Sequence, residues 1–132
     1  MFDLGQLFGF KKTANLDVDN FVLEDFNDKN VRISLKKGVA LKEKLSDKAY
    51  LLDVRTKDQY DYAHVKGAGH FDVEDMMGQI PDSYDKDHLF IGYCNTGGSS
   101  NAAQMILSQK GYKVIDAGGI VGYDGEIEGD YR

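Results

Sequence analysis

Two apolar runs of strand length, residues 50–54 and 89–93, dominate the pattern of hydrophobic and polar positions along the chain. Neither run alternates apolar with polar side chains, which is typical of strands buried on both faces of a sheet. Residues 113–117 predict a further strand, and a brief strand is expected around Phe71. Residues 31–35 do alternate, which predicts a strand with one exposed face.

Helices are expected between these strands. The predicted helices are residues 40–45, a short segment that Thr56 caps, residues 73–80 before Pro81, and a segment from about residue 100 to the capping Gly111. Strands that alternate with helices indicate a parallel sheet covered by helices on both faces, and therefore an α/β fold. The glycine-rich tail, residues 122–132, is predicted to be a loop.

Length and composition fit one globular domain with an N-terminal extension. The chain has 132 residues, of which 42% are apolar, and a domain of this size buries about two thirds of its unfolded surface. We assign residues 1–25 to the extension and residues 26–132 to the domain. Residues 1–10 are apolar but lack a basic stretch and are shorter than the ~20 residues of a membrane helix, so we expect neither a signal peptide nor a membrane span.

Charge and cysteine content narrow the range of partners. The net charge is −6 and the basic residues form no patch beyond two lysine pairs, so nucleic acid is not an expected partner. A single cysteine, Cys94, cannot close an internal disulfide, which agrees with a reducing, cytoplasmic location. One cysteine and three scattered histidines provide no metal-ligand spacing, so we assign no metal and no other cofactor.

The most informative stretch follows the second apolar run. Cys94 stands at the end of that run, and before the next helix come Asn95, Thr96, Gly97, Gly98, Ser99 and Ser100. Open α/β sheets place their sites at the carboxyl ends of strands, and the free N–H groups of a glycine-rich loop and a helix N-terminus attract anions. Such surroundings favour the thiolate form of cysteine, so the sequence predicts a nucleophilic Cys94 held by loop amides.

A simpler interpretation stays open at this point. Cysteine is often a small buried apolar residue, and the two glycines of the loop suit an ordinary strand-to-helix turn. Cys94, however, stands at the start of the loop rather than within the apolar run, and six small or polar residues follow it. We therefore favour the nucleophile.

The sequence resembles the rhodanese family over about residues 31–125. Four motifs carry the resemblance in the family's order: residues 51–55, Tyr60 with residues 64–68, residues 93–100, and Gly118 with Gly119. The resemblance implies a rhodanese-like fold, with a central, mostly parallel sheet flanked by helices on both faces. It also implies a single-domain sulfurtransferase. In this family the cysteine takes sulfane sulfur from a donor such as thiosulfate, holds it as a persulfide on the loop amides, and passes it to a thiol, cyanide or a sulfur-accepting protein.

The chain departs from the family pattern at several positions. Active-site loops of the family often carry Arg or Lys where this loop has Asn95 and Ser99, so the loop offers no cation to a sulfonate and we expect weak turnover of thiosulfate. Gln59 stands in place of a common acid, Ala63 in place of a glycine, and Tyr123 in place of a tryptophan. We expect these three replacements to be structural.

Other polar residues near the predicted site have alternative roles. Arg55 either contributes charge to the bound substrate or forms a salt bridge with Asp53, and we favour the salt bridge. His64 is expected to hydrogen-bond locally and fix a turn rather than act as a base. Of Ser99 and Ser100, we expect one to cap the helix and the other to contact the sulfur, and the sequence does not say which.

Three functions compete. Sulfur transfer through Cys94 is the first. A phosphatase or arsenate reductase of related fold needs an arginine to grip the oxyanion, and Ser99 stands where that arginine is expected, so this function is disfavoured. A non-catalytic module for protein binding or redox sensing is the main alternative, because the loop lacks its usual cation and the N-terminal extension supplies surface.

Overall fold

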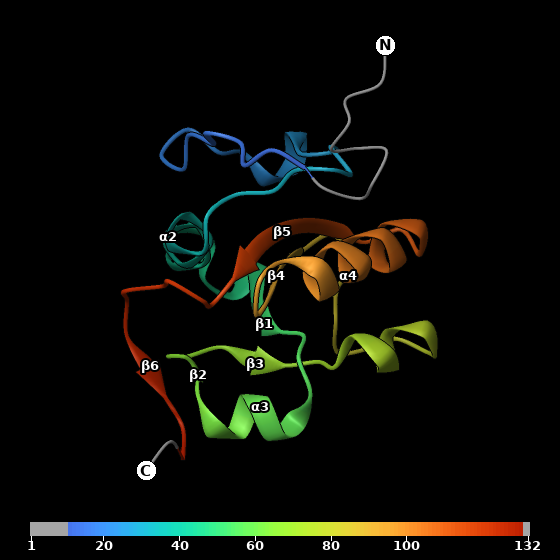
Figure 1. Ribbon diagram of the computed structural model, residues 1–132. Helices are drawn as coiled ribbons and strands as arrows, with labels where there is room; N and C mark the ends of the chain where they lie inside the picture. Colours follow the sequence, from blue (N-terminus) through green and yellow to red (C-terminus); the bar gives the residue numbers. More distant parts are fainter. Residues whose placement is uncertain (1–10, 131–132) are drawn as a thin grey trace.

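The computed structural model describes residues 11–130, and a four-stranded parallel sheet forms its centre (Figure 1). The strands lie in the order β3-β1-β4-β5. Their bounds are Gly69–His70 for β3, Ala49–Asp53 for β1, Leu89–Cys94 for β4 and Lys113–Gly119 for β5. A separate antiparallel ribbon pairs β2 (His64–Val65) with β6 (Ile127–Glu128).

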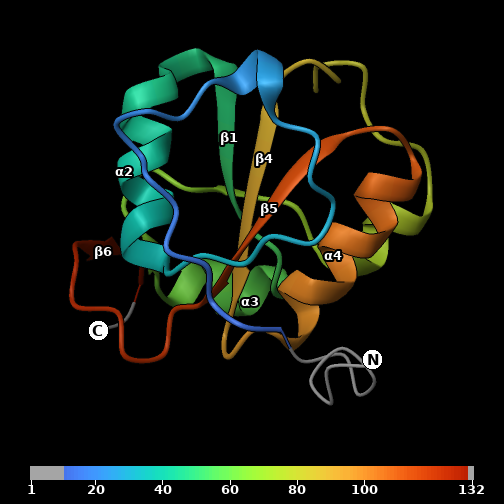
Figure 2. The same cartoon turned by 90° about the horizontal axis from the view of Figure 1, so that it is seen from above.

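Helices cover both faces of the sheet, as the sequence predicted. The α-helices are α2 (Leu35–Leu45), α3 (Lys57–Tyr62) and α4 (Gly98–Gln109), and the 3-10 helices are η1 (Leu23–Asp25), η2 (Ser46–Lys48) and η3 (Val73–Met77). Seen from above, α2 and α4 lie on opposite sides of β1, β4 and β5 (Figure 2). The α/β architecture with a mostly parallel sheet is therefore confirmed.

Burial on both faces explains why β4 is a continuous apolar run. All six of its residues are buried. Ile91 and Tyr93 belong to the apolar cluster that includes residues of α2, whereas Phe90 and Cys94 belong to the cluster that includes residues of α4. Alternate side chains of a strand point to opposite faces, so Cys94 lies on the face that α4 covers.

Two predicted elements differ in the structure at the start of the domain. Residues 31–35 form no regular strand, and only Arg32 makes isolated bridges, to Thr13 and to Asp116. The helix predicted from residue 40 begins at Leu35, because the Ser34 side chain accepts a hydrogen bond from the Lys37 N–H and caps it. The sequence pattern missed this cap.

Two further predictions need correction. The helix predicted for residues 73–80 is a 3-10 turn that ends at Met77, before Gly78. The tail predicted as a loop contains β6, because Ile127 pairs with Val65 and Glu128 with His64. Neither two-residue strand is long enough to show a period in the sequence, so only the tertiary contact reveals the ribbon.

Residues 11–30 run beside α2 and β5 (Figure 1). Several apolar side chains of this segment pack against the α2-side cluster: Leu16, Val18, Phe21, Leu23 and Phe26. The Ala14 N–H donates to the Arg32 carbonyl at 2.7 Å. The predictions for residues 1–10 lie outside the described residues. Between residues 11 and 130, no helix has the length and apolar character that crossing a membrane requires.

Candidate active site

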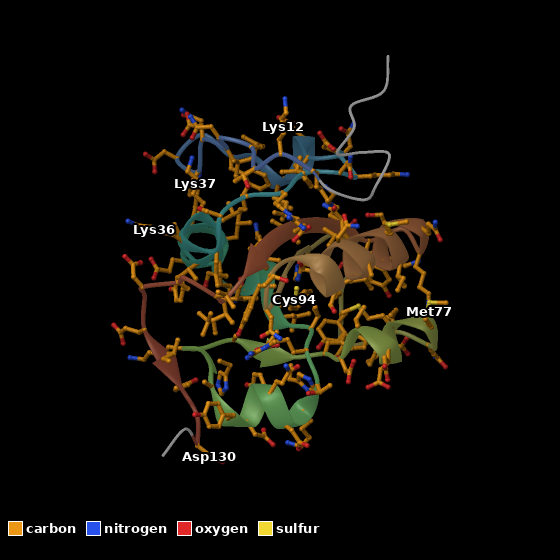
Figure 3. All side chains as sticks on the ribbon, viewed as in Figure 1. Lys12, Lys36, Lys37, Met77, Cys94 and Asp130 are labelled. Atoms are coloured by element: carbon orange, nitrogen blue, oxygen red, sulfur yellow. The ribbon has the colours of Figure 1, made fainter. Side chains whose placement is uncertain are left out.

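Cys94 is the last residue of β4 and stands at the carboxyl edge of the sheet, close to the start of α4 (Figure 3). Cys94 is only 3% exposed. Two backbone N–H groups point at its Sγ atom, from Gly97 at 3.0 Å and from Ser100 at 3.3 Å. The side chain is therefore buried, yet its sulfur faces amide donors that stabilise a negative charge.

Two glycines allow this loop to fold so tightly. Gly97 has φ +112°, in the left-handed region that side chains rarely adopt, and it precedes the first residue of α4. Gly119, at the end of β5, packs closely against the loop. A Cβ atom on Gly119 would lie 2.0 Å from the Asn95 carbonyl oxygen, so only glycine fits there.

Cys94 lines a cavity of about 280 Å³. The residues around this cavity are Val54, Arg55, Thr56, Gln59, Asp72, Val73, Glu74, Cys94, Asn95, Thr96, Gly98 and Ser99. The structure thus brings most of the predicted site residues to one cavity. Gly97 and Ser100 are not among its walls, and they contact the sulfur through their N–H groups instead.

Arg55 forms the predicted salt bridge with Asp53. Its Nη2 atom lies 2.7 Å from Asp53 Oδ2, and its Nε atom donates to Asp53 Oδ1 at 3.0 Å. The Nη1 atom donates to Asn95 Oδ1 at 3.0 Å, which ties the guanidinium to the loop. Burial by itself lowers the pKa of Arg55, but hydrogen bonds and charge from Asp53 outweigh it, so the pKa is raised. Arg55 stays charged, and each of its three nitrogens donates to a protein acceptor.

A second buried Arg–Asp pair lies on the other side of the loop, and the sequence analysis missed it. Asp116, on β5, is fully buried, and Arg32 reaches its Oδ2 atom through Nε at 3.0 Å and Nη2 at 2.9 Å. The same Nη2 atom donates to the Gly97 carbonyl at 2.7 Å. A carboxylate inside an apolar strand was the one available signal, since such a charge needs a partner.

One of the two roles expected of the loop serines, the helix cap, is not found. Gly97 is the residue before α4, and no side chain caps this helix, so the predicted serine cap is wrong. Ser100 instead lies inside the first turn, where its N–H contacts Cys94. Ser99 lines the cavity. Because helix α4 starts earlier than expected, the position suited to a capping hydroxyl falls on a glycine.

Comparison with known proteins assigns the family. The Rhodanese-like domain model matches residues 39–126 of this chain. The chain belongs to the rhodanese-like domain family. The thiosulfate sulfurtransferase GlpE of Actinobacillus succinogenes is 36% identical over 67 residues, which cover 51% of this chain and 60% of that relative. The chain thus spans less than two thirds of that relative's length.

A curated relative and a solved structure, both from Escherichia coli, agree with this assignment. The thiosulfate sulfurtransferase PspE is 37% identical over 71 residues, which cover 52% of this chain and 68% of the relative. A rhodanese solved with anions has a TM-score of 0.55 and 32% identity, covering 61% of this chain and 98% of that chain. Relatives of this rhodanese-like domain therefore include proteins named as sulfurtransferases.

His64 of this rhodanese-like domain makes local, structural contacts. The ring of His64 stacks on Tyr60, with 3.8 Å between the ring centroids, and its Nδ1 atom lies 2.7 Å from the Tyr60 carbonyl oxygen. Its Nε2 atom lies 3.2 Å from Glu128 Oε1 across the β2–β6 ribbon. These contacts agree with the predicted turn-fixing role. Across residues 11–130, no group of three or more potential ligand side chains is placed to hold a metal ion.

Proposed function

We propose that this rhodanese-like domain is a sulfurtransferase that carries sulfane sulfur as a persulfide on Cys94, from a donor such as thiosulfate to a thiophilic acceptor. The observation that carries the proposal is the pair of N–H groups, from Gly97 and Ser100, on a sulfur atom that also lines a cavity. The amides stabilise the anionic sulfur, and the cavity gives a small donor access to it. The sequence similarity to thiosulfate sulfurtransferases supports the same function.

The reaction proceeds in two displacements at sulfur. The Cys94 thiolate attacks the outer sulfur of thiosulfate, the bond between the two donor sulfur atoms breaks, and its electron pair leaves with sulfite. An acceptor thiolate or cyanide then attacks the outer sulfur of the Cys94 persulfide. The S–S bond breaks and the Cys94 thiolate is regenerated. A thiol that cycles in this way suits a reducing compartment such as the cytoplasm.

Mass spectrometry of the intact protein tests the proposal. Incubation with thiosulfate or with a low-molecular-weight persulfide should add about 32 Da, the mass of one sulfur atom, and peptide mapping should place it on Cys94. Treatment with cyanide should remove the added mass and release thiocyanate. The Cys94→Ser variant is the control and should gain no mass. If no donor modifies the native protein, the proposal is wrong.

The alternative is a non-catalytic binding or redox-sensing module, and the deep burial of Cys94, 3% exposed, favours the binding role. In that case the cysteine contributes packing and the partner binds elsewhere. A pull-down with the native protein and with Cys94→Ser, run beside the sulfur-transfer assay, separates the two functions. Equal partner capture by both forms, without transfer by either, supports the module.

A further inference from the structure

Asp116 links three parts of the molecule next to the proposed sulfur site. Its Oδ1 atom accepts hydrogen bonds from the Ser100 hydroxyl at 2.6 Å and from the Gly118 N–H at 2.8 Å. Its Oδ2 atom is held by Arg32 and also lies 3.5 Å from Lys11 Nζ. A carboxylate with no exposed surface is stable only when charged partners and hydrogen bonds satisfy it, and Arg32 is the partner that also contacts the loop.

The Asp116 carboxylate determines what the Ser100 hydroxyl offers to Cys94. A hydroxyl has one proton to donate, and the shortest of its contacts, 2.6 Å, is to the Asp116 carboxylate. The oxygen therefore presents lone pairs to Cys94 Sγ, 3.5 Å away, and can accept from a thiol S–H. The donors that stabilise a sulfur anion are thus backbone N–H groups, and their aim depends on how firmly Gly97 and Ser100 are held.

Arg32 holds both of these residues. It contacts Gly97 directly, because Nη2 donates to the Gly97 carbonyl at 2.7 Å, and it reaches Ser100 through Asp116. The guanidinium also packs closely against the loop, since a Cβ atom on Gly97 would lie 2.7 Å from Nη2. Arg32 lies 65 positions before Gly97 in the chain. A cation from a distant segment of the chain therefore holds the loop.

We propose that Arg32 is a positioning residue for sulfur transfer, which together with Asp116 holds the Gly97 and Ser100 N–H groups on the Cys94 sulfur. This inference rests on the proposed function, sulfur transfer through Cys94. Arg32 does not line the Cys94 cavity, so it acts on the reacting sulfur through the loop and not by touching the donor. Its positive charge also offsets the negative charge that Asp116 places near the thiolate.

The pH dependence of Cys94 alkylation by iodoacetamide tests the proposal without any sulfur donor. Arg32→Gln removes the cation and the bridge, so the midpoint of the alkylation profile should rise by about one pH unit. Arg32→Lys keeps a charge for Asp116 but loses the planar fork that serves two acceptors, and its midpoint should rise by less. The rate of persulfide formation at pH 7 should fall in the same order.

Lys37→Gln is the matched control, because it removes one positive charge from a side chain that holds the N-terminal segment through the Leu16 carbonyl and makes no recorded contact with the loop. Its midpoint should equal that of the native protein.

If Arg32→Gln does not fold, Arg32→Lys decides: a raised midpoint supports the proposal. Unchanged midpoints in the folded Arg32 variants, even with lower stability, would show a purely structural role and overturn it. The midpoint is independent of sulfur transfer, so failure of the proposed function would appear separately, as absence of the 32 Da adduct.

Discussion

Two buried Arg–Asp pairs flank the loop of Cys94, and they differ in how the chain builds them. Asp53 and Arg55 are two residues apart at the end of β1, whereas Arg32 and Asp116 are 84 residues apart. Both aspartates are fully buried. Each arginine also donates to the loop, Arg55 to the Asn95 side chain and Arg32 to the Gly97 carbonyl. The same chemistry thus holds the loop on both sides, once through local sequence and once through tertiary structure.

Replacement of either arginine by methionine should have the largest effect on stability. Each change removes the arginine partner of a buried carboxylate, which costs up to about 3–5 kcal/mol of the free energy of unfolding. We expect Arg55→Met to cost more, because the Arg55 side chain is 9% exposed against 17% for Arg32 and also donates to the Ala63 carbonyl. Urea unfolding at pH 7 measures both values.

The double variant Arg32→Met/Asp116→Leu serves as the control for this comparison. It removes both charges of the pair and should recover about 2 kcal/mol relative to Arg32→Met alone, because apolar side chains can replace a buried ion pair. A double variant that is no more stable than the single one would show that the loss comes from packing. If Arg32→Met lowers the free energy of unfolding more than Arg55→Met does, the predicted order is wrong.

The contrast between the pairs also explains what the sequence could predict. The salt bridge of Arg55 with Asp53 follows from two side chains at one strand end, and the apolar runs at residues 50–54 and 89–93 identified the two central strands. Arg32 was placed in a half-exposed strand, and nothing local indicated that it pairs with Asp116. Contacts between distant segments, like those of β2 with β6, leave no periodic pattern, so sequence analysis found the cysteine loop but not its support.

Arg55, the arginine that lines the Cys94 cavity, donates from all three of its nitrogens to protein acceptors, and this sharpens the prediction for thiosulfate. The Cys94 cavity is also lined by Asp72 and by the exposed Glu74, whose negative charges repel a dianionic donor. Glu74→Gln should raise the rate of persulfide formation from thiosulfate about twofold to threefold at low salt. The rate with an uncharged persulfide donor should not change. Stopped incubations analysed by mass spectrometry provide both rates.

Asp47→Asn is the matched control for Glu74→Gln. Asp47 is exposed in η2, before the first residue of β1, and thus lies at the opposite edge of the sheet from Cys94. The Asp47→Asn variant changes the net charge by the same amount as Glu74→Gln, but far from the cavity. Its rate of persulfide formation from thiosulfate should therefore stay near the native value. The gain in Glu74→Gln should shrink in 0.5 M salt, where screening extends over only about 4 Å. Equal gains in both variants would mean that overall charge, and not the cavity entrance, governs the rate.

The smallest expected effect concerns Lys11, a cation that, among residues 11–130, forms an ion pair with Asp116 but not with Asp53. Lys11 Nζ lies 3.5 Å from Asp116 Oδ2, and its side chain is 7% exposed. Burial lowers the pKa of Lys11 below 10.5, although the charge of Asp116 opposes the shift. In the folded protein Lys11 therefore loses its proton at lower pH than in the unfolded chain. Between these two pKa values the unfolded state holds more protons, so the free energy of unfolding rises with pH.

The Lys11→Met variant isolates this contribution because it lacks the titrating group. We take the free energy of unfolding of the native protein minus that of the variant. This difference should increase with pH between the folded-state pKa of Lys11 and 10.5, and it should be smallest below the folded-state pKa. We expect a change below about 0.5 kcal/mol, because the charge of Asp116 opposes the effect of burial on the Lys11 pKa. Urea unfolding of both proteins at pH 7, 8, 9 and 10 measures the difference. A difference that decreases with pH would mean that the ion pair with Asp116 outweighs burial and raises the Lys11 pKa, in which case Asp116 depends on two cations where Asp53 depends on one.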